Sequence, residues 1–215
     1  MAKKKVNPNR IPIAANSIDI QQIVNDASDK MVLQAWALIL GALADFSDTT
    51  TDSLLHLWNT INSFQITICT HDEIAAEIKK IEDLTGLKIP FKQVTSIDIK
   101  TQGDLERCKR KAEQNALYSS LGLIACPIMA QKLLPEDVFI RVFRKVFSLD
   151  EEISLGKNGR VSLDDILEIL KDEYSLNLFE SNGHTILRRL NDSPAQNSES
   201  SLLLSTKIIT HKNSG

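Results

Sequence analysis

The chain has few aromatic residues and few cysteines. Only 5% of its 215 residues are Phe, Trp or Tyr, so Leu, Ile, Val and Ala must build the hydrophobic core. The cysteines are odd in number (Cys69, Cys108 and Cys126), and Cys69 and Cys126 sit in apolar stretches. This use of cysteine is typical of buried, reduced thiols in a cytosolic protein and excludes a disulfide scaffold.

The sequence also lacks segments that direct a chain into or across a membrane. Lys3-Lys4-Lys5 is followed by a mostly polar run instead of the apolar core of a secretory signal. No stretch reaches the roughly 20 apolar residues that a membrane span needs. A net charge of −3 argues against a general nucleic-acid coat or a membrane-surface binder, but it permits a local basic patch. We therefore expect a cytoplasmic protein without a membrane partner.

No calcium-binding loop is complete in this chain. The run 158–162 followed by Asp165 is similar to the second half of an EF-hand loop, with Gly159 at the sixth position. Positions one and three would then be Ser154 and Gly156, which carry no carboxylate. We interpret this segment as a Gly-rich turn into a helix that Ser162 caps.

Other catalytic and metal-binding patterns are equally incomplete. Cys69 and His71 have no second pair at zinc-like spacing, and an apolar environment around Cys126 would raise rather than lower its pKa. Acidic pairs near expected helix starts are explained by the helix dipole; they are Asp72-Glu73, Glu151-Glu152 and Asp164-Asp165. We predict a protein that is not an enzyme and holds no cofactor and no metal.

An internal repeat is the most informative pattern that is present. At an offset of 85 positions, apolar residues of two helical patterns coincide, and the offset becomes 89 after the run 156–159. The alternative is that two unrelated amphipathic segments align by chance. The matching pairs include Trp36 with Leu121, Ile39 with Ile124, Trp58 with Phe143, Ile78 with Leu167 and Ile81 with Leu170.

The fold is predicted to be mostly α, with two similar three-helix halves packed together through Leu- and Ile-rich faces. Apolar spacing of three and four residues, with capping signals, predicts helices over about 18–45, 51–64, 71–86 and 104–131, then one from 135 and one after 162. The expected divisions are a basic arm (1–16), a first helical half (17–91), a linker (92–103), a second half (104–179) and a flexible C-terminal tail (180–215). We expect Pro127 to kink or break the fourth helix.

Beyond residue 201 the tail contains a small apolar element, Leu202-Leu203-Leu204 with Ile208-Ile209, after a linker-like run. Docking on the body, pairing with another chain and mobility are all compatible with this composition. Trp36 and Trp58 are expected to face one another in the core of the first half, with a ligand-stacking role as the alternative.

Basic residues form the most distinctive exposed feature. Lys3, Lys4, Lys5 and Arg10 lie in an arm with two prolines and no acidic residue before Asp19. A second basic run follows in the fourth helix: Arg107, Lys109, Arg110 and Lys111. Either cluster could neutralise phosphates, although Lys-rich ends are often simply solvated.

The opening run from Met1 to Pro12 resembles the start of small uncharacterised proteins encoded by phages and prophages of Gram-positive bacteria. Those proteins are about the size of one half of this chain, and they share a basic arm with prolines and a first long helix that contains a Trp, as at Trp36. The likeness covers the first 60–90 residues; the second half has no such arm. The resemblance implies a phage-derived accessory protein inside a bacterial host cell, and it brings no site residue with it.

Three functions follow as expectations. The first is a non-catalytic phage-encoded protein that binds a bacterial host protein and inhibits a host defence system. The second is a nucleic-acid-associated accessory factor that uses the arm from Lys3 to Arg10. The third is a small-ligand binder with a pocket between the halves near Trp36 and Trp58. If single-half relatives dimerise, the chain is a fused version of that dimer, and a homo-oligomer stays open.

Overall fold

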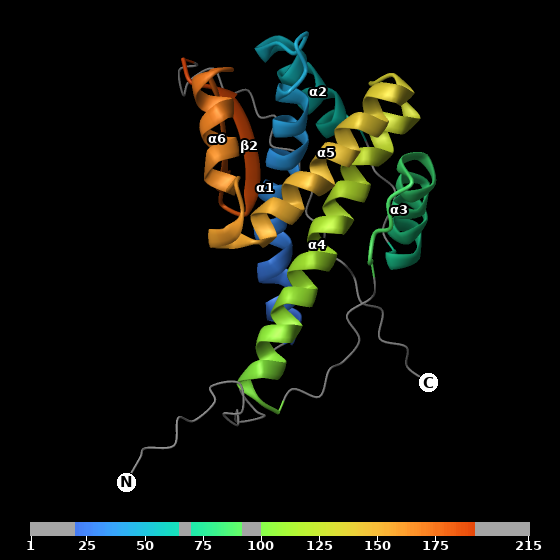
Figure 1. Ribbon diagram of the computed structural model, residues 1–215, viewed down its shortest axis with the longest axis vertical. Helices are drawn as coiled ribbons and strands as arrows, with labels where there is room; N and C mark the ends of the chain where they lie inside the picture. The colour runs from blue at the N-terminus through green and yellow to red at the C-terminus, as the bar shows by residue number, and fades with distance from the viewer. Residues whose placement is uncertain (1–19, 65–69, 92–99, 192–215) are drawn as a thin grey trace.

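The computed structural model describes residues 20–64, 70–91 and 100–191, and this part of the chain is mostly helical (Figure 1). The helices in chain order are α1 (Ile20–Ala44), α2 (Thr51–Ser63), α3 (His71–Thr85), α4 (Gln102–Ala130), α5 (Glu136–Ser154) and α6 (Leu163–Asp172). A short 3-10 turn (Gly156–Asn158) precedes α6, and two strands, β1 (Leu176–Ser181) and β2 (His184–Arg189), follow it. The predicted mostly α class is confirmed; the arm 1–16 lies outside the described residues.

Four of these helices begin with a capping box. Thr50, Thr70, Thr101 and Ser162 each accept a hydrogen bond from the backbone N–H three residues later, and that residue's side chain bonds back. Two backbone donors at each helix start are thereby satisfied locally. The helix boundaries therefore follow the local sequence closely.

The core forms around α1 and α4, which pack against one another. Figure 1 shows both helices running in the same direction, with their N-terminal ends at one end of the molecule. The ion pair between Lys30 and Glu113 joins corresponding turns of the two helices. The segment 35–40 of α1 is almost fully buried, as its apolar composition on nearly every side predicts.

The third helix of each predicted half packs against the central helix of the other predicted half. α3 lies on α4 and α5, whereas α6 lies on α1, so these two helices occupy opposite sides of the α1–α4 pair (Figure 1). Each contact is made at a glycine: a Cβ on Gly41 would lie 2.6 Å from Ile166, and one on Gly122 would lie 3.2 Å from Ile78. The absence of a side chain at these positions permits the close approach.

The internal duplication stays a prediction, and the helix starts refine its register. α2 and α5 begin at Thr51 and Glu136, an offset of 136 − 51 = 85, as expected. The caps of α3 and α6, Thr70 and Ser162, are separated by 162 − 70 = 92 positions instead of the proposed 89. The buried residues of α3 and α6 also coincide at 92, with Ile74 matching Ile166.

A β-hairpin replaces the first part of the expected flexible tail. β1 and β2 pair antiparallel, with Leu178 opposite Leu187, and the hairpin packs beside α6 and α1. Asn182 and Gly183 form the turn, and both have positive φ angles of 53° and 75°. Asn-Gly is the preferred pair for a two-residue hairpin turn because both residues tolerate this conformation. The assignment of 180–215 to a tail is therefore wrong for residues 180–189.

α4 continues through Pro127 to Ala130 instead of breaking there. Pro127 is buried in the apolar half of the helix, and its carbonyl accepts a hydrogen bond from the backbone of Gln131. Burial of the surrounding apolar side chains stabilises the helix although one backbone donor is missing.

Candidate functional site

The basic residues of α4 are all exposed, but they do not share one face. At about 100° per residue, Arg107, Arg110 and Lys111 lie within one arc of the helix, whereas Lys109 lies about 200° from Arg107. Lys3, Lys4, Lys5 and Arg10 lie outside the described residues. The structure therefore brings together three of the eight predicted basic contact residues.

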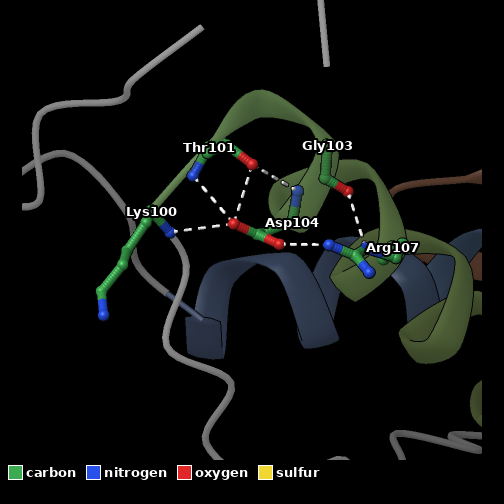
Figure 2. Close-up of polar contacts among 5 residues, drawn as sticks. All are labelled: Lys100, Thr101, Gly103, Asp104 and Arg107. Atoms are coloured by element: carbon green, nitrogen blue, oxygen red, sulfur yellow. Dashed lines mark hydrogen bonds and ion pairs between the residues drawn. The ribbon is translucent and has the colours of Figure 1, made fainter. Parts of the chain in front are cut away.

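The side chain of Arg107 already interacts with two residues at the start of its own helix. Its guanidinium forms an ion pair with Asp104 and donates to the carbonyl of Gly103 (Figure 2). The hydroxyl of Thr101, and then backbone donors, lower the pKa of Asp104 by stabilising its carboxylate. Asp104 therefore remains charged and offsets one of the three positive charges on this face.

The basic face of α4 and the attachment point of the arm lie at the same end of the molecule. The arm precedes Ile20, at the N-terminus of α1, and this terminus lies beside the N-terminus of α4 (Figure 1). Acidic groups share this end, since Asp26 is exposed on α1 and Glu113 pairs with Lys30. The electrostatic character of this end is therefore mixed, and Arg110 and Lys111 are among its exposed cations.

A first apolar groove, here called the α3–α5 groove, opens between α3, the end of α4 and the start of α5. It has a volume of about 460 Å³. Leu84, a large hydrophobic residue with 36% of its surface exposed, forms one wall. Lys132 and Glu136 provide opposite charges at the rim. The other lining residues are Ile128, Met129, Leu134, Pro135 and Phe139.

A second groove, here called the α2–α5 groove, lies on the other side of the loop between α4 and α5. It has a volume of about 450 Å³, and Leu134 contributes to both grooves. Arg141 lies on one edge, where its guanidinium stacks over Phe46 at 5.1 Å and pairs with Asp137. The remaining lining residues are Leu43, Ser47, Asp48, Thr49, Ser53, Leu54, His56, Leu57, Leu133 and Val138.

The two tryptophans meet as predicted. Their ring centroids are 4.3 Å apart, and both side chains are almost fully buried. The two grooves are lined by other residues, and close packing leaves these rings little surface for a ligand. The geometry of Trp36 and Trp58 thus favours a packing role.

A polar cluster joins three helices inside the body. Gln34 of α1 donates a hydrogen bond of 3.2 Å to Asp150 of α5. Burial raises the pKa of Asp150, and the hydrogen bond from Gln34 opposes this effect. Burial, with the nearby charge of Asp150, also raises the pKa of Tyr118 on α4, while its contact with Gln114 acts in the opposite direction. The sequence pattern did not reveal this cluster because its members lie far apart in the chain.

The described cysteines are buried or half-buried, and burial raises the pKa of both Cys108 and Cys126. Neither is therefore an activated thiolate. Cys69 lies outside the described residues. Within the described ranges, no group of three His, Cys, Asp or Glu residues lies close enough to hold a metal ion. The turn near Gly159 is closed by the carboxylate of Glu152, which accepts from the backbone of Arg160.

One described helical segment, Asn25–Ala44, is long and apolar enough to cross a membrane by length and composition. In the folded chain, 62% of this apolar window is buried, as in the core helix of a globular fold. This observation is weak evidence for a membrane span.

Comparison with known proteins adds no relative: no protein-family model, curated protein or solved structure matches this chain.

Proposed function

We propose that this chain is a non-catalytic, phage-encoded binding protein that occupies a bacterial host protein, with inhibition of a host defence system as its task. The observation that carries the binding function is the α3–α5 groove, which combines an apolar floor with two opposite charges at its rim. The phage origin and the host rest on the resemblance of the N-terminal arm alone.

The composition of the groove fits a protein side chain as its ligand. Exposed apolar surface around Leu84 is removed from water when a partner covers it. Met129 is flexible and polarisable and can adapt to different partner side chains. Lys132 and Glu136 can fix the orientation of the partner through charge complementarity.

The experiment is affinity capture from a nuclease-treated Gram-positive host lysate, with the full chain and two variants as bait. Leu84→Glu places a charge in the wall of the groove and should abolish capture of the partner. Leu155→Glu is the matched control, because Leu155 is an exposed leucine (52%) outside both described grooves. Equal capture by all three baits, or turnover of nucleotide or nucleic acid by the purified chain, would defeat this proposal.

A second function, a nucleic-acid-associated accessory factor, is favoured by the position of Arg110 and Lys111. These exposed cations lie in the N-terminal third of α4, and the N-terminus of α4 lies near that of α1, which the arm precedes in the sequence. Deletion of residues 1–10 should then abolish nucleic-acid binding, and Arg110→Glu with Lys111→Glu should reduce the salt dependence of binding by about two counterions. Lys171→Glu is the matched control, because Lys171 is an exposed cation of α6. Binding that survives the arm deletion unchanged would reject this mechanism.

A further inference from the structure

The α2–α5 groove lies beside the point at which the described part of the chain ends. Arg189, the last residue of β2, pairs with Asp52 in the first turn of α2. Ser53, the next residue of α2, lines the groove. The described chain ends at Asn191, two positions after Arg189. The residues that follow therefore start next to an apolar groove.

The following segment has the composition and the reach to fill this groove. Residues 192–201 are mostly polar, and residues 202–209 contain three leucines, two isoleucines and a single charge, Lys207. Ten linking residues span at most about 35 Å, and a flexible chain of this length has an average end-to-end distance of about 17 Å. We propose that residues 202–209 dock in the α2–α5 groove of the same chain.

The groove complements this segment in polarity and charge. Its floor is built by leucines and by Val138, which remove apolar side chains from water. Its rim carries the exposed carboxylate of Asp48, which can pair with Lys207. Arg141, the cation at the rim, forms its ion pair with Asp137. The carboxylate of Asp48 is therefore available to pair with Lys207.

The covalent connection of residues 202–209 to the end of β2 favours them as the occupant of the groove over the N-terminal arm and over a second copy of the chain. The arm joins α1 at Ile20, which lies 23 residues and therefore about 35 Å along the helix from Leu43 in the groove. Tethering through about ten residues gives a segment an effective concentration on the order of millimolar, which exceeds the concentration of free copies in a dilute sample. Intrachain docking therefore outcompetes exchange between chains.

The test places a photo-crosslinking benzoylphenylalanine at position 204 of the full chain and maps the products by mass spectrometry. We expect crosslinks within one chain to peptides from 43–57 or 133–141, at a yield that does not change with protein concentration. Val138→Glu should lower this yield at least about tenfold, because the segment would have to desolvate a carboxylate. Leu84→Glu, in the other groove, should leave the yield unchanged and serves as the matched control.

A second pair of variants keeps the proposal testable if Val138→Glu fails to fold, because it exchanges the charges of Asp48 and Lys207. Asp48→Lys alone should lower the yield, and Lys207→Glu in the same chain should restore it, because the pair is re-formed with opposite sign. Crosslinks between two chains that increase with concentration, crosslinks to the α3–α5 groove, or products spread over the surface would each overturn the proposal. Affinity capture with the Leu84→Glu bait is a separate measurement from this crosslinking test. Failure of the crosslinking test therefore leaves the proposed function standing, and failure of the capture experiment leaves the docking proposal standing.

Discussion

At the scale of single residues, the environment of Asp150 differs from what its sequence context suggests. It lies at the junction of α1, α4 and α5, and its partner Gln34 is 116 positions away in the chain. Burial disfavours the charged carboxylate and raises its pKa above the ordinary value of 3.8. The sequence around Asp150 is that of an ordinary acidic helix end, so periodicity alone does not reveal this shift.

We predict that Asp150→Asn stabilises the protein at neutral pH. The folded state binds more protons than the unfolded state between pH 3.8 and the raised pKa, so the free energy of unfolding decreases as pH rises through this window. Asn stays neutral and still accepts the hydrogen bond from Gln34. The gain should be on the order of 1 kcal/mol at pH 7 and should vanish below about pH 3.8, measured by urea denaturation across pH.

The control for this experiment is Glu168→Gln, which removes an exposed carboxylate from α6. It should change stability little at any pH. An Asp150→Asn variant that is less stable than the parent at pH 7 would show that the folded protein stabilises the charged carboxylate.

At the scale of helices and strands, local signals determine where each element begins. Ser162 is the clearest case, because its hydroxyl accepts from the backbone of Asp165 and the Asp165 carboxylate bonds back to Ser162. Ser162→Ala should lower the free energy of unfolding by about 1 kcal/mol, measured by chemical denaturation. Ser63→Ala, at the exposed end of α2, is the control and should cost less. Equal losses would mean that the cap contributes nothing specific.

The contact between α1 and α6 depends on a single missing side chain. A methyl group at Gly41 would lie 2.6 Å from Ile166, which is almost fully buried and too stiff to move freely. We predict that Gly41→Ala destabilises the protein by about 1–2 kcal/mol despite the higher helix propensity of Ala. Thermal melting is the measurement.

Gly122→Ala is the matched control for this contact, because its added methyl group would meet Ile78 at the more tolerable distance of 3.2 Å. The loss caused by Gly41→Ala should also shrink when Ile166 is replaced by Ala, as a double-mutant cycle would show. A loss that is independent of residue 166 would contradict the steric explanation.

At the scale of the whole molecule, the two predicted halves cover one another's apolar faces. α3 covers α4 and α5, and α6 with the hairpin covers α1 (Figure 1). A chain cut within 92–99 should therefore assemble as a one-to-one complex when both pieces are co-expressed, measured by co-purification and light scattering. Each piece alone should aggregate or lose its cooperative melting transition, because its apolar faces lack their cover. Two independently stable monomers would contradict this interlocked arrangement and weigh against a fused dimer as its origin.

The sequence by itself determined the helical class, most helix boundaries and the pairing of Trp36 with Trp58. These features depend on hydrogen bonds and apolar spacing within a few residues or between neighbouring helices. Asn182-Gly183 is a local hairpin signal as well, so the β1–β2 turn is also encoded within a few residues of the sequence.

Only the tertiary structure decided which buried helix faces pack against one another. Several features require surfaces that are far apart in the chain. They are the packing of α3 on α4, the continuation of α4 through Pro127, the raised pKa of Asp150 and the two grooves beside Leu134. Apolar periodicity specifies that a helix face is buried, but close packing of particular shapes selects its partner. Sites built from such contacts therefore appear only when the chain is folded.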